Sequence, residues 1–166
     1  LVDRGRHDQQ RHLAHLGGLR GVLDQLEDVR AQDDLTRRHR DVDPDLEGVR
    51  VLRTLGESLA LREHAGTARN AVVIGAGFIG CEVAASLRSL GVAVVLVEPQ
   101  PTPLASVLGE QIGQLVARLH RAEGVDVRCG VGVTEIKGTG HVEKVVLSDG
   151  AELDADIVVV GVGSRP

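Results

Sequence analysis

The stretch AVVIGAGFIGCEVAASLRSLGVAVVLVE, residues 71–98, decides the fold of this chain. An apolar strand runs into the turn Gly75-Ala76-Gly77-Phe78-Ile79-Gly80, an amphipathic run follows, and a second apolar strand ends on Glu98. A strand, a glycine turn, a helix, a strand and a terminal acid are the layout of a dinucleotide-binding βαβ unit. Because the whole context is present, the pattern favours a nucleotide site over a glycine-rich turn that binds nothing.

Each position in the glycine turn has an expected task. Gly75 allows the tight turn out of the strand, and Gly77, which has no Cβ, lets a pyrophosphate approach the backbone. Gly80 lets the following helix lie close to the strand. The free backbone N–H groups at the helix start, around Phe78 and Ile79, are expected to point at the phosphates, whose negative charge the helix dipole favours.

Glu98 is the expected ribose ligand. It lies 18 residues beyond Gly80, at the carboxyl end of the second strand. Its carboxylate can accept hydrogen bonds from the adenosine ribose hydroxyls, and it would repel a 2′-phosphate. No Arg or Lys lies between Glu98 and Arg118 to offset that repulsion. The sequence therefore predicts NAD as the cofactor, with NADH preferred over NADPH.

The composition excludes several classes of protein. The chain has 166 residues, of which 42% are apolar and 26% charged, as in an ordinary globular protein with room for one domain and some extra length. A net charge of −5 gives no reason to expect nucleic acid or an acidic membrane as a partner. There is no apolar run long enough to span a membrane and no signal peptide, so the expected compartment is the cytoplasm. Cys81 and Cys129 form neither a CxxC pair nor a disulfide framework.

Residues 1–45 are expected to be a poorly ordered or loosely helical amino-terminal segment. Leucines between residues 13 and 26 recur at helical spacing, but three glycines in the same stretch each cost about 1 kcal/mol relative to Ala in a helix. His7, His12 and His15 raise the alternative of a metal site. No Cys or ordered ligand cluster accompanies them, so no metal is predicted. The chain begins with Leu rather than Met, which favours a fragment or a processed chain.

Residues 46–69 are expected to be a linker with one short helix. Thr54 and Glu57 match a capping box, which predicts a helix over Leu55–His64 that ends at Gly66. The expected apolar face of this helix consists of Leu55, Leu59 and Leu61.

Residues 70–166 are expected to form the nucleotide-binding domain. Three prolines at 99–103 exclude a regular element there. A helix is predicted over Gly109–Glu123, with its apolar positions at Ile112, Leu115, Val116 and Leu119. A parallel strand is predicted over 125–129. Alternating segments at 131–137, 141–147 and 151–153, separated by turns, predict an antiparallel meander in place of a crossover helix. The predicted fold class is therefore α/β, a Rossmann-like three-layer NAD(P)-binding domain with an antiparallel β-meander crossover.

A last apolar run, Asp156–Val160, predicts a strand buried on both faces. It ends in the glycine turn Gly161-Val162-Gly163. This turn is either a simple strand exit or backbone laid against a bound cofactor.

Four segments together carry a family resemblance. They are VVIGAGFIGCEVAASLRSLG at 72–91, VVLVE at 94–98, LSDGAELDADIVVVGVGSRP at 147–166 and VLRTLGESLALREH at 51–64. With them the chain resembles the NADH-binding domain of FAD-dependent pyridine nucleotide reductases, and most of all the ferredoxin and rubredoxin reductases of oxygenase and cytochrome P450 systems. The resemblance covers about residues 46–166.

The resemblance implies a hydride path from NADH to a flavin, and single electrons from the flavin to a ferredoxin or rubredoxin. It places Glu82 near the nicotinamide as a positioning and electrostatic residue; the alternative for Glu82 is an acid in the first helical turn, favoured by the helix dipole. FAD is implied by the family, but its own glycine fingerprint is not found in residues 1–70. An Arg that is usual in the loop after the ribose acid is also absent, and Thr102 stands near that place.

Three functions remain open from the sequence. The first is the NADH-binding part of a flavin-dependent oxidoreductase, where the flavin carries the chemistry and the protein orients it. The second is a non-catalytic dinucleotide-binding module or an inactive reductase fragment. The third, a stand-alone dehydrogenase, ranks last because no Tyr/Lys or His/Asp catalytic set is recognisable.

Overall fold

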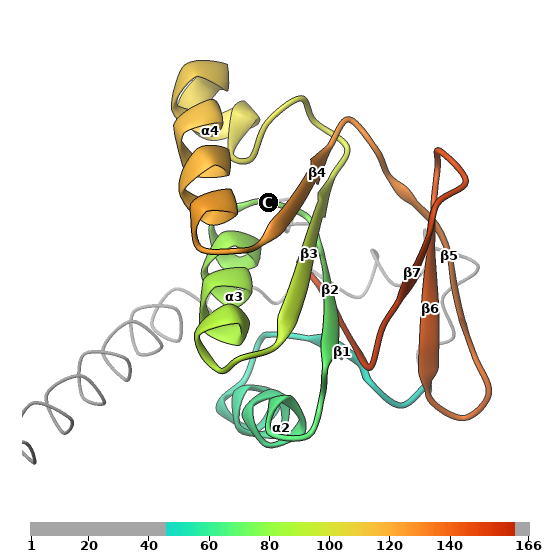
Figure 1. Cartoon of the computed structure of the whole chain (residues 1–166). Helices are drawn as coiled ribbons and strands as arrows, with labels where there is room; N and C mark the ends of the chain where they lie inside the picture. The colour runs from blue at the N-terminus through green and yellow to red at the C-terminus, as the bar shows by residue number, and fades with distance from the viewer. Residues whose placement is uncertain (1–45, 162–166) are drawn as a thin grey trace, which may run out of the picture.

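The computed structural model describes residues 46–161, which form three layers (Figure 1). A five-stranded parallel sheet lies in the middle, helices α3 (Phe78–Ser89) and α4 (Ala105–Ala122) cover one face, and a three-stranded antiparallel sheet covers the other. This is the predicted Rossmann-like architecture. The predictions for residues 1–45, including the three histidines, lie outside the described residues.

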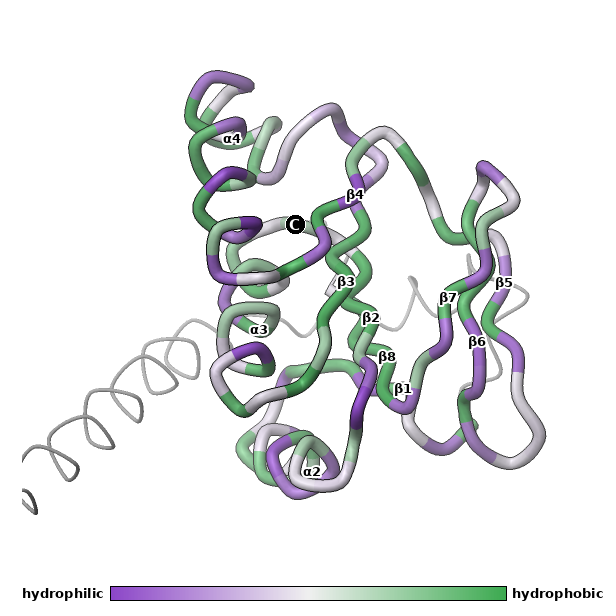
Figure 2. Tube along the Cα trace, viewed as in Figure 1, coloured by the Kyte–Doolittle hydropathy of each residue, from purple (hydrophilic) through white to green (hydrophobic). Residues whose placement is uncertain are grey.

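The parallel sheet has the strand order β1-β8-β2-β3-β4. Its strands are β1 (Val49–Val51), β2 (Asn70–Ile74), β3 (Ala93–Glu98), β4 (Asp126–Cys129) and β8 (Ile157–Val160). Every neighbouring pair is parallel. The central strands β2 and β8 are almost continuously apolar because both of their faces are covered, and Figure 2 shows these apolar strands in the interior.

Helix α3 (Phe78–Ser89) connects β2 to β3, as predicted. Its buried side consists of Gly80, Cys81, Val83, Ala84 and Leu87. These residues pack with the helix-facing side chains of the sheet into one apolar cluster. The glycine turn therefore lies between the end of β2 and a helix that is packed directly onto the sheet.

Helix α4 (Ala105–Ala122) begins four residues earlier than predicted. Gly109 has φ 76° and ψ 166°, so a first turn is joined to the main helix across a kink. The large apolar residues that indicated the helix do not provide its buried face: Ile112, Leu115 and Leu119 are each more than two-fifths exposed. Gly113 and Ala117 are buried instead. The loop at Thr102 and Pro103 lies so close to Gly113 that an added Cβ would overlap it, so only glycine fits at that position.

The meander consists of β5 (Val133–Gly138), β6 (Val142–Leu147) and β7 (Glu152–Asp154), close to the predicted segments. Its inner side chains and the opposite face of the parallel sheet form a second apolar cluster. On its outer side Lys137 and Lys144 each lie 3.0 Å from a carboxylate oxygen of Glu152. These are exposed pairs, which contribute little to stability.

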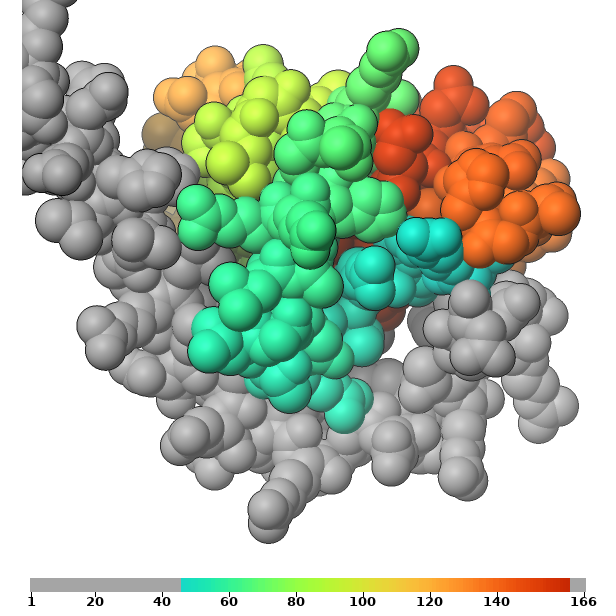
Figure 3. Space-filling model, turned by 90° about the horizontal axis from the view of Figure 1, so that it is seen from below, coloured from blue at the N-terminus to red at the C-terminus, as the bar shows by residue number. Residues whose placement is uncertain are grey.

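Residues 46–69 are not only a linker, because they contribute a strand and a helix to the domain. β1 joins the edge of the parallel sheet beside β8, and α2 (Leu55–Ala65) follows it with both halves of the predicted capping box formed. The predicted apolar face of α2 was wrong for Leu55 and Leu59, which are 60% and 55% exposed, and was confirmed for Leu61, which is buried. The helix contacts the core mainly through its last turns, where Leu61 and Ala65 are buried. Seen from below, residues 46–50 lie between α2 and the meander (Figure 3).

No helix within residues 46–161 is both long enough and apolar enough to cross a membrane.

Candidate nucleotide site

The glycine turn lies where the strand order reverses. From β2 the chain continues to β3 and β4 on one side, whereas β8 and β1 lie on the other side of β2. In open α/β sheets, ligands bind outside the carboxyl ends of the strands at such a switch point. Gly75 follows the carboxyl end of β2, and Gly161 follows the carboxyl end of β8. Gly75 and Gly161 therefore both lie at the edge of the sheet where this fold binds ligands.

Gly75 makes the turn that the sequence predicted. Its φ is +94°, which favours glycine, and its N–H donates to the carbonyl oxygen of Val97 at 2.8 Å. The chain thus leaves β2 sharply while it is still bonded to the end of β3.

Gly80 and Gly77 lack a side chain for different reasons. A Cβ at Gly80 would overlap the carbonyl oxygen of Gly75 and lie 3.6 Å from Val73, so Gly80 is needed for close contact between helix and strand, as predicted. A Cβ at Gly77 would meet nothing within 4 Å. Gly77 therefore faces open space, from which a ligand could reach the backbone.

The start of α3 is open to an anion. Gly77 is the N-cap residue, and no side chain makes a capping hydrogen bond to this helix. Phe78 is 49% exposed and Ile79 is half-buried. The first backbone N–H groups of an α-helix have no partner within the helix, and together with the helix dipole they suit a phosphate group.

Glu98 is bonded to the glycine turn, a contact that sequence reasoning missed. Its Oε2 accepts a hydrogen bond from the N–H of Ala76 at 2.6 Å, and its Oε1 accepts one from the N–H of Gln100 at 2.9 Å. The carbonyl oxygen of Ala76 accepts from the N–H of Leu104 at 2.9 Å. The fully buried Ala76 is thus held on one side by the end of β3 and on the other by the start of α4.

The loop after Glu98 is buried although it has no regular structure. Thr102, Pro103 and Leu104 are all buried beneath α4. Leu104 has φ 56°, the one positive φ at a non-glycine residue within the described part of the chain. A left-handed backbone costs a side-chain-bearing residue about 1–2 kcal/mol, and here the bond to Ala76 and the burial of the leucine offset that cost. Thr102 packs against α4, because a Cβ added at Gly113 of that helix would overlap the Oγ1 of Thr102.

Gly161 lies directly beside the glycine turn. Its N–H donates to the carbonyl oxygen of Ile74 at 2.7 Å, and a Cβ on it would be 3.8 Å from the Cα of Gly80. This position agrees with backbone that borders a bound cofactor. The other two predicted residues of that turn, Val162 and Gly163, lie outside the described residues.

Glu82 is exposed on α3 and has no hydrogen bond or ion pair to another residue of the range 46–161. It is the fifth residue of the helix, and the first turn of α3 contains no acid. The alternative that Glu82 is a first-turn acid stabilised by the dipole is therefore wrong. A role beside the nicotinamide stays a prediction.

The two cysteines are free thiols with little reactivity. Cys81 is buried, and burial, followed by the nearby charge of Glu98, raises its pKa to about 11. Burial also raises the pKa of Cys129, which is half-buried, while the guanidinium of Arg121 acts in the opposite direction. Arg121 is a basic neighbour that the sequence did not reveal, but it does not make Cys129 a nucleophile.

The folded chain should therefore resist alkylation at Cys81. A shift of the thiol pKa from 9.0 to about 11 lowers the thiolate fraction at pH 7.5 about 100-fold, and the thiolate is the reacting form. Mass spectrometry after iodoacetamide treatment should show Cys81 modified at least that much more slowly in the native chain than in urea. Equal rates in the two conditions would contradict the buried position of this thiol.

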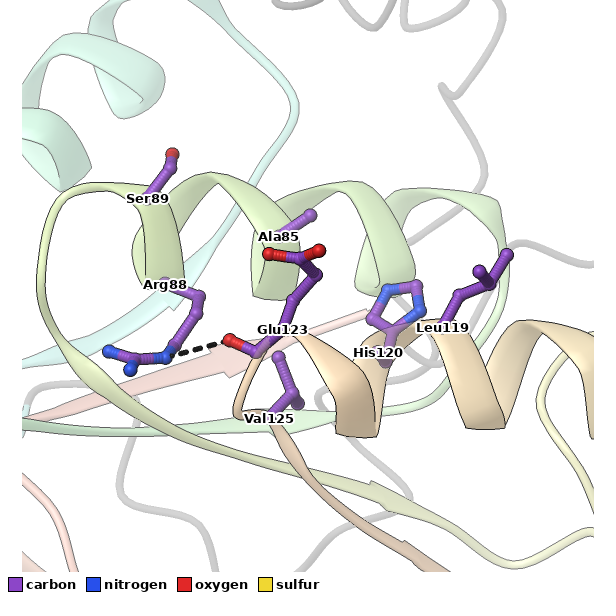
Figure 4. A pocket seen from close by; sticks show the side chains of 7 residues that line it. All are labelled: Ala85, Arg88, Ser89, Leu119, His120, Glu123 and Val125. Carbon is purple, nitrogen blue, oxygen red and sulfur yellow. Dashed lines mark hydrogen bonds between the residues drawn. The ribbon is translucent and has the colours of Figure 1, made fainter.

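A surface groove of about 520 Å³ lies between the carboxyl-terminal ends of α3 and α4 (Figure 4). It is lined by Ala85, Arg88, Ser89, Leu119, His120, Glu123 and Val125. Arg88 Nε donates to the carbonyl oxygen of Glu123 at 3.1 Å, which ties the two helices together. The groove is at the opposite end of α3 from the glycine turn, so we do not assign the nucleotide to it.

The described residues contain no group of three or more His, Cys, Asp and Glu side chains that could hold a metal ion. The candidate site is thus built from backbone N–H groups and the carboxylate of Glu98.

Comparison with known proteins agrees with this architecture. The fold and the glycine turn define a Rossmann-like α/β domain, and the family model for pyridine nucleotide-disulphide oxidoreductases matches residues 38–166. The chain belongs to the pyridine nucleotide-disulphide oxidoreductase family.

Its curated relatives include electron-transfer reductases. It is 38% identical over 123 residues to a rubredoxin-NAD(+) reductase of Ectopseudomonas oleovorans, a match that covers 74% of this chain and 32% of the relative. It is also 38% identical over 121 residues to the ferredoxin--NAD(+) reductase subunit of the benzene 1,2-dioxygenase system of Pseudomonas putida, with 73% of this chain and 30% of the relative covered. The chain thus spans about a third of the length of these relatives.

Solved structures give the same relationship. A ferredoxin reductase from Rhodopseudomonas palustris matches with a TM-score of 0.69 and 42% identity, covering 76% of this chain and 33% of that structure. Putidaredoxin reductase, in its covalent complex with putidaredoxin, matches with a TM-score of 0.69 and 34% identity over 72% of this chain and 29% of that structure.

Proposed function

We propose that this chain is the NADH-binding part of a FAD-dependent reductase, in which hydride from NADH reduces a flavin and the electrons pass to an iron–sulfur protein such as a ferredoxin or rubredoxin. The observation that carries the proposal is the glycine turn at the switch point of the sheet, with Glu98 at the end of the next strand. The names of the relatives, which are NAD(+) reductases for ferredoxin and rubredoxin, support the choice of donor and acceptor.

The residues of this chain would bind and orient the dinucleotide. The pyrophosphate would lie over Gly77 and the start of α3, where a Cβ is absent and N–H groups are available. The adenosine ribose would lie at Glu98, and the nicotinamide end would extend past Gly161 toward Glu82. When bound, NADH supplies the hydride from its nicotinamide ring.

The flavin has no site that the described residues define. Residues 46–161 contain one dinucleotide-binding unit, which consists of a strand, a glycine turn and a helix. The NADH site proposed above already uses this unit. The relatives are about three times as long as the part that this chain matches. The single unit of strand, glycine turn and helix within residues 46–161 supports a second candidate function, a dinucleotide-binding module without turnover.

An absorption spectrum separates the two candidates. If the purified chain carries bound flavin, with absorbance near the flavin maxima, the reductase function applies to this chain itself. If it binds NADH but no flavin, even after incubation with FAD, the chain is a binding module. If it binds neither, both candidates are wrong for the isolated chain.

Replacing Glu98 by alanine should weaken NADH binding. The ribose hydroxyls would lose a charged hydrogen-bond acceptor, which costs roughly 1–3 kcal/mol, or about fivefold to 150-fold in Kd. The preference for NADH over NADPH should shrink at the same time, because the charge that repels the 2′-phosphate is gone. Isothermal titration calorimetry with both nucleotides measures the two effects.

Glu143→Ala is the control for this experiment, since Glu143 is an exposed acid on β6. It should leave both affinities unchanged. A Glu98→Ala variant that is folded and binds NADH as tightly as the original chain would show that the ribose assignment is wrong.

A further inference from the structure

We infer that Glu98 is also a positioning residue, whose carboxylate holds the glycine turn in its binding shape before any nucleotide arrives. This inference rests on the proposed function where it concerns the ligand. Its structural part concerns the empty chain alone and can be tested without a nucleotide.

The two carboxylate oxygens of Glu98 serve two different segments of backbone. Oε2 accepts from Ala76 in the glycine turn, and Oε1 accepts from Gln100 in the loop that follows β3. Hydrogen bonds to an ionised carboxylate are shorter and stronger than those between neutral groups, and 2.6 and 2.9 Å fit that class. One side chain therefore joins the turn after β2 to the loop after β3.

Ala76 depends on this bond because the residue is completely buried. A buried N–H without a partner is strongly unfavourable, and water has no access to replace the carboxylate. The carbonyl oxygen of Ala76 is also occupied, by the N–H of Leu104 at 2.9 Å and by the thiol of Cys81 at 3.6 Å. The middle residue of the glycine turn is thus fixed through both of its peptide groups.

Glu57 provides a contrast within the same chain. In the capping box of α2, a single oxygen, Oε2, accepts from both Arg53 and Thr54 at 2.8 and 2.7 Å. A glutamine has one carbonyl oxygen, so it can replace Glu57 without losing either bond. At Glu98 both oxygens are needed. A glutamine there would turn its NH₂ group toward one of two backbone N–H donors.

The same two bonds have a consequence for ligand choice. Each carboxylate oxygen has a second lone pair, so both can still accept from ribose hydroxyls. The carboxylate cannot swing aside without releasing Ala76 and Gln100, however, so a 2′-phosphate would meet a fixed negative charge. Selectivity for NADH would then come from the rigidity of Glu98 as well as from its charge.

Amide hydrogen exchange of the nucleotide-free, full-length chain tests the structural part. In Glu98→Gln the carbonyl oxygen can keep one of the two bonds, so the amide that faces the NH₂ group, either Ala76 or Gln100, should exchange about tenfold faster or more, the loss expected for one hydrogen bond of about 1.4 kcal/mol. In Glu57→Gln both rates should stay unchanged. Unchanged exchange at Ala76 and Gln100 in a folded Glu98→Gln variant would overturn the inference.

Glu98→Asp is the second variant, and it keeps the test decisive if Glu98→Gln does not fold. Aspartate is shorter but retains two acceptor oxygens and the charge. At the amide that loses its bond in Glu98→Gln, the protection by aspartate should lie between that of the original chain and that of Glu98→Gln. If that amide exchanges as fast in Glu98→Asp as in Glu98→Gln, or as fast as in urea, then hydrogen bonding to the two carboxylate oxygens does not hold the turn.

Binding of a modified nucleotide separates positioning from direct contact. An NADH analogue without the adenosine 2′ and 3′ hydroxyls cannot bond to the carboxylate through its ribose. If Glu98 positions the turn, Glu98→Gln should still weaken the analogue several-fold relative to the original chain. If the loss seen with NADH vanishes with the analogue, Glu98 acts only through the ribose. If the original chain binds neither nucleotide, the proposed function fails, and hydrogen exchange still decides the structural part.

Discussion

The Gly77→Val substitution should abolish NADH binding while the chain stays folded. Gly77 has φ −73° and ψ −173°, an extended backbone that valine adopts without strain. A Cβ here would meet nothing within 4 Å beyond its chain neighbours, so a valine side chain would project into the space that we assign to the pyrophosphate. Valine is a poorer N-cap residue than glycine, which should lower stability by no more than about 1 kcal/mol.

Calorimetric titration and urea denaturation of Gly77→Val measure the two parts of this prediction. Gly56→Val is a suitable control, because a side chain at Gly56 on α2 also has room and is far from the glycine turn. That control should bind NADH normally. Normal binding by a folded Gly77→Val variant would remove the basis for placing the phosphates at this turn.

The Gly80→Ala substitution should lower the stability of the fold, whereas Gly77→Val should leave the fold intact and remove NADH binding. Its Cβ would overlap the carbonyl oxygen of Gly75, which belongs to the backbone and cannot rotate away like the end of a side chain. Overpacking of this kind typically costs 1–3 kcal/mol and sometimes more. Because the overlap is with backbone, we take the upper end of that range, and the advantage of alanine over glycine in a helix, about 1 kcal/mol, then leaves a net loss of about 2 kcal/mol or an unfolded chain.

The midpoint of urea unfolding measures this loss. Gly77→Ala is the matched control, since the same added methyl group three residues earlier has open space and should cost no more than the N-cap loss of about 1 kcal/mol. If Gly80→Ala were as stable as Gly77→Ala, α3 would not lie as close to β2 as the structure shows. Together the two glycines separate the requirement of the ligand from the requirement of the fold.

Much of the fold could be predicted from local patterns. The turn at Gly75, the contact at Gly80 and the capping box of α2 depend on residues that are neighbours in the sequence, so their chemistry is visible there. The meander could be predicted because its alternating strands are joined by short turns. The long apolar runs of β2 and β8 indicated strands covered on both faces.

Features that depend on distant residues could not be predicted. The bond from Ala76 to Glu98 joins residues 22 positions apart, and neither one signals the other in the sequence. The buried face of α4 follows from how closely the loop at Thr102 approaches Gly113, so the larger Ile112 and Leu115 point outward. The meeting of Gly161 with the glycine turn depends on the strand order, which local patterns do not give.

The most direct test of the central claim is calorimetric titration of the whole chain with NADH and, separately, with NADPH. We expect one NADH to bind per chain and NADPH to bind clearly more weakly, because the carboxylate of Glu98 would face the ribose. Equal binding of the two nucleotides would contradict the role of Glu98 in selectivity. If a folded chain bound neither nucleotide, the glycine turn at the switch point would not be a nucleotide site in this chain.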